Sequence, residues 1–380
     1  MKLLKQFIQQ ETVLTAAAVL AVVSAFFVPP DAQYLGYIDL RTLAILFSLM
    51  TVMAGLRRQG FFDGLGRALL SRTHSTLQLT LVLVGLCFFG SMFITNDVSL
   101  LTFVPFTFVV LNRLGADVRR ALLIPVVCMQ TVAANLGSML TPIGNPQNLY
   151  LYARANMSAL ALIRLMLPYS IAALVLLLVW IQIAAHREPG STTENHISEL
   201  FSIHKTKAPN QTSLIGYLIL FLICLLVVAH IIDYRISFIL VIGYIFFKNW
   251  HLFKKVDYSL LLTFTALFIF IGNLKCIPQF NHFLISIIDG HETLTAILSS
   301  QIISNVPAAI LLSGFTKNYS ALIIGTNIGG LGTLIASMAS LISFKYIAKE
   351  KTTLRGKYFM MFTIANIVFL ILLLLCINLL

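Results

Sequence analysis

The sequence predicts an all-α polytopic membrane protein. Its 380 residues are 58% hydrophobic and 11% charged, a composition typical of a chain that crosses a bilayer repeatedly. Apolar runs long enough to cross recur along the chain, from residues 13–28 to residues 358–380. A few polar islands with glycine and proline interrupt them. In lipid, such open backbone persists only where it is buried in protein or lines a polar cavity. We therefore expect membrane helices around a polar centre.

The chain begins with two ordinary crossings, over residues 13–28 and 38–56. Residues 60–72 mix apolar and charged side chains, which favours an amphipathic helix in the membrane interface. An ordinary connecting loop is the alternative, because three glycines weaken a helix there. In residues 77–111, two apolar arms flank the polar tip Thr95-Asn96-Asp97. The second arm is short for a full crossing, which favours a re-entrant hairpin.

The next segment, residues 119–152, is predicted to be a broken helix. It enters the membrane and meets the island Asn-Leu-Gly-Ser-Met-Leu-Thr-Pro-Ile-Gly-Asn-Pro-Gln-Asn, residues 135–148. Glycine and proline break a helix there, and the Asn, Ser and Thr side chains offer oxygen ligands. Residues 161–185 then cross back.

A long hydrophilic stretch, residues 186–212, reads as a cytoplasmic linker between two halves, residues 1–185 and 213–380. The second half is predicted to follow the order of the first. Its expected elements are spans at 213–232, 238–247 and 258–271, a mixed segment at 275–289, a hairpin at 292–315 with the tip Ser304-Asn305, a broken helix at 319–347, and a last span at 358–380.

The two islands align with each other at a single offset, which indicates an internal repeat. The aligned pairs are Asn135 with Asn327, Gly137 with Gly329, Ser138 with Gly330, Thr141 with Thr333, Ile143 with Ile335, Gly144 with Ala336 and Asn145 with Ser337. The shared glycines could serve close packing alone. Their common spacing, with a polar-tipped hairpin upstream of each island, favours a repeated backbone geometry as well.

Lysine and arginine predict the orientation, since cytoplasmic loops carry most of them. With the N-terminus in the cytoplasm, nine crossings and two hairpins leave the C-terminus outside. Most of the 26 basic residues then lie inside; those outside are Arg41, Arg154, Arg164, Arg235, Lys275 and Lys317. The second half is inverted relative to the first, as in alternating-access secondary transporters. A bacterial inner membrane is the expected location.

The predicted site lies where hairpin tips and breaks converge. Freed carbonyls and Asn, Ser and Thr oxygens suit Na⁺, while broken-helix N-termini favour a small anion. Asp97 is the only one of the 14 acids with long apolar arms on both sides, so it is a candidate to carry a proton or to balance a cation. The alternative is that Asp97 only caps the following helix in a water-filled cavity.

Several function classes are disfavoured. The net charge of +12 reflects basic residues at the ends of spans, so no nucleic acid is expected as a partner. The five cysteines are scattered and no metal-spaced Cys/His set occurs. A membrane enzyme would need a paired base or nucleophile, and only Asp97 is deep, so no catalytic residue and no cofactor beyond a coupling Na⁺ is predicted.

The stretch Thr-Pro-Ile-Gly-Asn-Pro-Gln-Asn at 141–148 resembles the signature of the divalent anion/sodium symporter and citrate-permease-like families of the ion transporter superfamily. The resemblance implies elevator motion, often within a homodimer. It implies one Na⁺ site from Thr95, Asn96 and Gly144, and another from Ser304, Asn305 and Ala336. It implies that the substrate contacts Asn96, Asp97, Asn145, Pro146, Asn305 and Ser337. The supporting positions are Asn135, Gly137, Ser138, Thr141, Asn148, Asn327, Gly329 and Thr333.

Two positions depart from that family pattern. Asp97 and Val306 stand where the symporters have threonine, and the Asn-Asp pair resembles the hairpins of arsenite permeases. The prediction is therefore a secondary transporter of a carboxylate or inorganic oxyanion, driven by Na⁺ or H⁺. The alternative is a cation/proton antiporter or an arsenite-type efflux permease with Asp97 as proton carrier.

Overall fold

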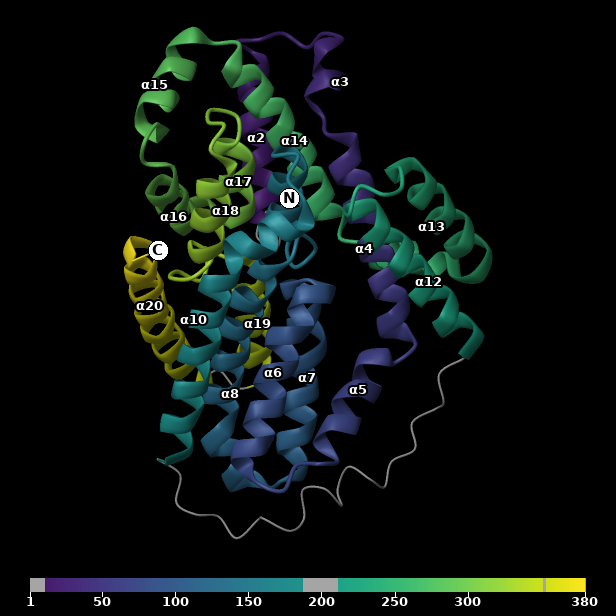
Figure 1. Ribbon diagram of the computed structural model, residues 1–380, viewed down its shortest axis with the longest axis vertical. Helices are drawn as coiled ribbons and strands as arrows, with labels where there is room; N and C mark the ends of the chain where they lie inside the picture. Colours follow the sequence, from purple (N-terminus) through teal and green to yellow (C-terminus); the bar gives the residue numbers. More distant parts are fainter. Residues whose placement is uncertain (1–10, 187–210, 351–352, 380) are drawn as a thin grey trace.

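The protein is a bundle of helices (Figure 1). The computed structural model describes residues 11–186, 211–350 and 353–379, and all regular structure within these ranges is helical. Eight helices in these ranges are long and apolar enough to cross a membrane. The predicted all-α polytopic membrane protein is confirmed. The predicted linker at 186–212 lies, apart from its two ends, outside the described residues.

The first half follows the predicted order. Its helices are α2 (Thr12–Ala25), α3 (Gln33–Tyr37), α4 (Leu40–Arg58), α5 (Phe61–Leu70), α6 (Thr76–Ile94), α7 (Asn96–Arg113), α8 (Ala116–Gly137), the 3₁₀ turn η1 (Ser138–Leu140), α9 (Pro146–Arg154) and α10 (Ala159–His186). The predicted hairpin at 77–111 corresponds to α6 and α7, and the predicted broken helix at 119–152 to α8, η1 and α9. The short α3 was not predicted.

The second half is built in the same way. Its helices are α12 (Gln211–Val228), α13 (Tyr234–Asn249), the 3₁₀ turn η2 (Trp250–Lys255), α14 (Tyr258–Lys275), α15 (Pro278–Ile288), α16 (Glu292–Ile303), α17 (Asn305–Leu312), α18 (Tyr319–Ile328), α19 (Met338–Glu350) and α20 (Leu354–Leu379). The second hairpin is α16 and α17, and the second broken helix is α18 and α19.

The helix predicted within residues 60–72 is present as α5. Gly60 precedes it with a φ of 71°, a left-handed conformation that glycine adopts without strain. Phe62, Gly66 and Leu70 are buried on one face, while Leu65 and Leu69 are exposed. Such a face of exposed leucines is typical of a helix that lies against lipid.

Both hairpins turn on a residue with the same strained backbone. Thr95 has φ 68° and ψ 152°, and Ser304 has φ 74° and ψ 153°. Residues other than glycine rarely adopt positive φ, so two matching cases are a shared feature of construction. After each turn the next amide N–H donates to the broken helix of its own half: Asn96 N to Gly144 O at 3.0 Å, and Asn305 N to Ala336 O at 2.9 Å.

Threonine side chains repeat the same pattern. The Thr141 hydroxyl donates to the Met92 carbonyl at 2.5 Å, and the Thr333 hydroxyl to the Gln301 carbonyl at 3.0 Å. Both carbonyls lie three residues before the hairpin turn. The predicted pairs Thr141 with Thr333 and Gly144 with Ala336 therefore occupy corresponding places in the two halves.

The aligned glycines Gly137 and Gly329 both lie where two helices pack closely. A Cβ on Gly137 would lie 2.0 Å from the Phe88 carbonyl oxygen of α6, and one on Gly329 would lie 2.9 Å from Cα of Ile297 in α16. Each glycine thus lets a broken helix touch the backbone of its hairpin. Figure 1 shows the loop before α6 at the lower end of the molecule and α15, which leads into α16, at the upper end. The inversion of the two halves and the nine crossings stay predictions.

Candidate functional site

The breaks of the two halves meet through asparagine side chains. Asn135, at the end of α8, donates from Nδ2 to Ser340 Oγ at 3.2 Å and accepts at Oδ1 from Ser337 Oγ at 2.9 Å. Both serines belong to the second broken helix. Buried amide groups need such partners, because an unpaired one costs about 1–3 kcal/mol.

Asn327, which aligns with Asn135, makes the reciprocal contacts. Its Oδ1 accepts from Asn145 Nδ2 at 2.9 Å, and its Nδ2 donates to Asn148 Oδ1 at 2.5 Å. Asn145 and Asn148 align with the two serines that bind Asn135. Each half therefore supplies an asparagine that satisfies the break of the other half. We call these six residues the asparagine network.

The tip of the first hairpin joins this network. Asn96 donates from Nδ2 to Asn135 Oδ1 at 3.3 Å, and its own Oδ1 accepts from the Asp97 amide N–H at 2.9 Å. Thr95 caps α7 by accepting from Val98 N at 3.4 Å. Neighbouring Ser138 accepts from Asn145 Nδ2 at 3.1 Å. The amides at the tip are thus held by the break that they face.

The residues expected to form two Na⁺ sites fall into two local groups. The bond from Asn96 N to Gly144 O brings Thr95, Asn96 and Gly144 together. The corresponding bond from Asn305 N to Ala336 O does the same for the second group, in which Ser304 Oγ also donates to Ala336 O at 3.5 Å. The hydroxyl, amide and carbonyl oxygens of each group are the hard donors that Na⁺ prefers.

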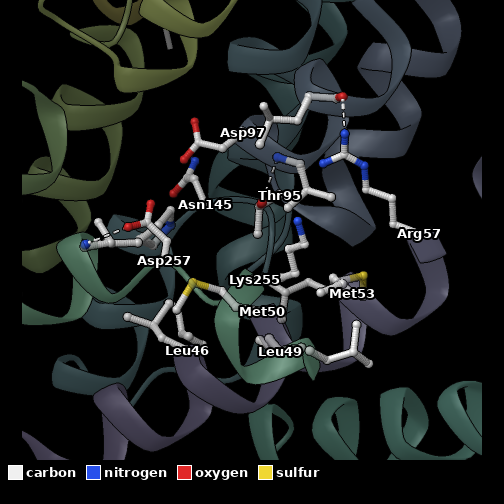
Figure 2. A pocket seen from close by; sticks show the side chains of 18 of the residues that line it. Leu46, Leu49, Met50, Met53, Arg57, Thr95, Asp97, Asn145, Lys255 and Asp257 are labelled. Carbon is white, nitrogen blue, oxygen red and sulfur yellow. Dashed lines mark hydrogen bonds between the residues drawn. The ribbon is translucent and has the colours of Figure 1, made fainter. Parts of the chain in front are cut away.

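A cavity of about 570 Å³ lies beside the first hairpin tip (Figure 2). One wall comes from the first hairpin and its broken helix: Thr95, Asp97, Val98, Leu101, Ile143, Asn145, Pro146 and Leu149. The opposite wall comes from α4, η2 and the start of α14: Leu46, Leu49, Met50, Met53, Ala54, Arg57, Arg58, His251, Leu252, Lys255, Asp257 and Leu260. The size suits a small solute.

Charged side chains of both signs line this cavity. Figure 2 shows Asp97, Asn145 and Asp257 at the left of the view and Arg57 at the right, with Lys255 near the centre. Asp257 is the N-cap of α14, and its Oδ1 accepts from Leu260 N at 3.0 Å. Oδ1 of Asp97, in contrast, is buried and has no hydrogen-bond partner among the described residues. An ionised carboxylate without partners is costly at such a place.

The structure separates the predicted substrate residues into two groups. Asp97, Asn145 and Pro146 line the cavity, together with the predicted Na⁺ ligand Thr95. Asn96, Asn305 and Ser337 are buried and are not among the residues that line it. Sequence reasoning missed the α4 and η2 residues and Asp257. The only signal for Asp257 was an acid directly before an apolar run, which reads as an ordinary cap.

A second cavity of about 260 Å³ lies further along α9 and α14, lined by residues that include Tyr150, Arg154, Phe268 and Lys275. At this cavity, the Tyr150 ring packs edge-on against Phe264, and its hydroxyl lies 2.8 Å from Ser313 Oγ.

Broken helices, a polar network between two halves and a cavity lined by ionisable groups define a membrane transport protein. The chain belongs to the citrate transporter (CitMHS) family, whose sequence profile matches residues 7–319. It is a transporter and not an enzyme.

Relatives carry related names. The chain is 34% identical to "Uncharacterized transporter MJ0456" of Methanocaldococcus jannaschii over 311 residues, which is 81% of each protein. It is 31% identical to "Inner membrane protein YbiR" of Escherichia coli over 331 residues, 84% of each. A shorter match, 32% over 135 residues, covers 36% of this chain and 27% of "Silicon efflux transporter LSI3" from Oryza sativa subsp. japonica.

Proposed function

We propose that the protein is a secondary active transporter of a small anion, a carboxylate or an inorganic oxyanion, and that proton binding at Asp97 couples the transport. The observation that carries the proposal is Asp97 itself. It lines the cavity, and one of its carboxylate oxygens is buried without a hydrogen-bond partner in the described structure. Ionisable groups inside membrane proteins are functional candidates by default.

The charges around Asp97 support an anionic solute that arrives with a proton. Arg57, Arg58 and Lys255 line the same cavity and attract an anion. An ionised Asp97 repels that anion, whereas a protonated Asp97 does not and can donate a hydrogen bond to it. Binding of the anion and of the proton then favour each other, which is the thermodynamic basis of coupling.

Sodium coupling is the second candidate. It is favoured by the two matching groups, Thr95 with Asn96 and Gly144, and Ser304 with Asn305 and Ala336, each closed by the same backbone hydrogen bond. Their oxygens would hold Na⁺ at the hairpin tips, and the ion would supply positive charge beside a bound anion. This role does not require Asp97 to change its protonation.

For the motion, we propose that the hairpins and broken helices move as one block against α4, α12, α13 and α14. The walls of the larger cavity support this division, because one wall belongs to the block and the other to α4, η2 and α14. The smaller cavity further along α9 and α14 supports access from a second side. We further propose that the protein lies in a bacterial inner membrane as a homodimer, with its N-terminus in the cytoplasm and its C-terminus outside.

The rice relative that is named a silicon efflux transporter widens the solutes to be tested to weak inorganic oxyacids. The test uses the purified protein in liposomes, with a pH gradient or a Na⁺ gradient imposed separately. Uptake of citrate, succinate, sulfate, phosphate, arsenite and silicic acid is measured. Asp97→Asn should abolish accumulation driven by the pH gradient and leave exchange of the same solute measurable.

The matched control is Asp117→Asn, because Asp117 is an exposed acid in the first turn of α8 and does not line the cavity. It should leave transport unchanged. Full accumulation by Asp97→Asn under a pH gradient would contradict proton coupling. Accumulation that follows Na⁺ alone and survives this substitution would establish the second candidate. Transport of cations in exchange for protons, without anions, would refute both.

A further inference from the structure

A third cavity lies between α5 and α7 and has a volume of about 390 Å³. It is distinct from the 570 Å³ cavity beside the first hairpin tip, which we call the solute cavity in line with the proposed function. Three arginines and one acid line it: Arg57, Arg67, Arg113 and Asp63. Its remaining surface is mostly apolar. The other lining residues are Leu101, Thr102, Pro105, Phe106, Val109 and Val110. A net positive, amphiphilic hollow of this kind is not needed for the transport cycle described above.

The three arginines come from three different helices. Arg57 is in the last turn of α4, Arg67 in the last turn of α5 and Arg113 in the last turn of α7. A helix C-terminus attracts a cation, which accounts for each arginine singly. This attraction does not explain why the arginines of three helix C-termini line the same hollow. Guanidinium groups are the usual donors to phosphate.

The position of the hollow selects the kind of phosphate. Helix α5 is amphipathic, with Leu65 at 46% exposed and Leu69 at 41% exposed on its outer side. Gly66 allows the buried side to approach α7, since a Cβ there would lie 2.9 Å from Phe106 Cε1. The hollow thus combines arginine side chains with apolar side chains of α7. A soluble phosphate would gain nothing from those apolar side chains, whereas a lipid brings both a phosphate and acyl chains.

We propose that this hollow binds the headgroup phosphate of an anionic phospholipid, with Arg67 and Arg113 as its main donors. The glycerol and the first acyl carbons would lie along Pro105 and Val109. In the orientation proposed above, the C-terminal ends of α5 and α7 face the cytoplasm, where anionic lipids are abundant and each basic residue near the surface strengthens their attraction. The proposal is independent of the transported solute and of the coupling ion.

Lipid occupancy would also reach the solute cavity. Arg57 and Leu101 line both hollows, and Arg57 Nη2 donates to the Leu101 carbonyl at 2.7 Å. The wall between the two hollows is therefore partly a single arginine side chain. A lipid in this hollow would lie against Arg57 and would restrict changes in the distance between α4 and α7.

The test is native mass spectrometry of the full chain, released from detergent micelles doped with phosphatidylglycerol or phosphatidylcholine. Wild-type protein should retain phosphatidylglycerol in preference to phosphatidylcholine. Arg67→Gln and Arg113→Gln should each lower retention about fivefold, as expected for the loss of one basic contact. Two variants on different helices guard against one that does not fold, and size-exclusion elution reports folding.

Arg72→Gln is the matched control, because Arg72 is an exposed arginine just beyond α5 and does not line the hollow. It should retain phosphatidylglycerol as the wild type does. Equal losses for Arg67→Gln and Arg72→Gln would show only diffuse surface attraction and would overturn the site. Equal retention of the two lipids would overturn it too. Displacement of the lipid by millimolar glycerol phosphate or inorganic phosphate would assign the hollow to a soluble phosphate instead.

Discussion

Asn145 and Asn327, 182 residues apart, are joined by a hydrogen bond of 2.9 Å from Nδ2 of the first to Oδ1 of the second. Both side chains are almost completely buried. Each lies at the break of a different broken helix, so the bond connects the two polar breaks directly. The counterpart bond, from Ser337 to Asn135, connects them a second time.

This pairing predicts strong coupling between the two positions. Asn327→Ala removes the acceptor of Asn145 and the donor to Asn148, and should cost about 1–3 kcal/mol of stability through the unpaired buried amides. Asn145→Ala should cost a similar amount. The double substitution should cost less than the sum, because the first change already removes the shared bond. Chemical or thermal unfolding in detergent, read by tryptophan fluorescence, measures all three.

Asn112→Ala serves as the control for that cycle, since Asn112 is exposed at the end of α7. It should leave stability within about 0.5 kcal/mol of the wild type. Strict additivity of the two buried substitutions would show that the bond contributes nothing beyond its separate residues.

The close approach at Gly137 predicts a steric penalty. Gly137→Ala would drive a methyl group into the Phe88 carbonyl of α6, at 2.0 Å, so the helices must separate. Overpacking of this kind costs about 1–3 kcal/mol. Gly85→Ala, in α6 itself, meets nothing within 4 Å and should be neutral or stabilising by up to about 1 kcal/mol. Gly137→Ala should therefore lower the melting temperature, whereas Gly85→Ala should leave it unchanged or raise it.

A proline explains why Arg57 bonds a helix carbonyl. Pro105 lies inside α7 and has no N–H, so it cannot bond to the Leu101 carbonyl four residues earlier. Arg57 of α4 donates to that carbonyl at 2.7 Å instead. Arg57→Ala should cost about 1.5–3 kcal/mol, the range for hydrogen bonds to charged groups.

In a Pro105→Ala background the same Arg57 substitution should cost markedly less, since the alanine N–H at that position can complete the helix and satisfy the Leu101 carbonyl. The cycle is measured by unfolding in detergent without anionic lipid, so that lipid binding does not contribute. An unchanged penalty in the alanine background would mean that Arg57 stabilises the protein by another route.

Asp257 allows its charge to be separated from its capping role. Asparagine caps helices about as well as aspartate, so Asp257→Asn should preserve α14 and leave the melting temperature unchanged. If the solute is an anion, removal of this negative charge from the cavity should lower KM several-fold, since one unit charge at 4 Å is worth about 1–4 kcal/mol between water and a protein surface.

The matched control is Asp233→Asn, because Asp233 is likewise an N-cap, of α13, and does not line the solute cavity. It should change neither KM nor stability. A rise in KM for Asp257→Asn would indicate that Asp257 attracts a positively charged solute or ion.

The hairpin turns and the helix breaks could be located from the sequence because their constraints are local. The turn at Thr95 and the break at Gly144 need particular residue types close together in the chain, and glycine, proline and asparagine report them. The positions predicted as pairs, such as Asn135 and Asn327, hold corresponding contacts in the two halves. Helix boundaries followed in the same way from apolar runs that end at polar residues.

The cavity residues of α4, η2 and α14 could not be predicted from the sequence, for a physical reason. Met50, Arg57 and Lys255 belong to an ordinary span and to a turn, and nothing in their neighbourhood distinguishes them from lipid-facing or loop residues. They become cavity residues only through the packing of α4 and α14 against the hairpin. Asn305 and Ser337, expected to face the substrate, are buried away from this cavity's lining, because packing and not the motif decides which polar side chains are accessible.

The asparagine network has a genetic consequence. Because each half completes the hydrogen bonds of the other, a substitution at one break changes the requirements at the other. We expect a harmful substitution at Asn327 to be compensated by a second substitution at Asn145 or Asn148. One at Asn135 should be compensated at Ser337 or Ser340. Suppressor mutations selected in a growth assay should therefore cluster in the opposite half, and the ancestry of the two halves would be recorded as compensating pairs.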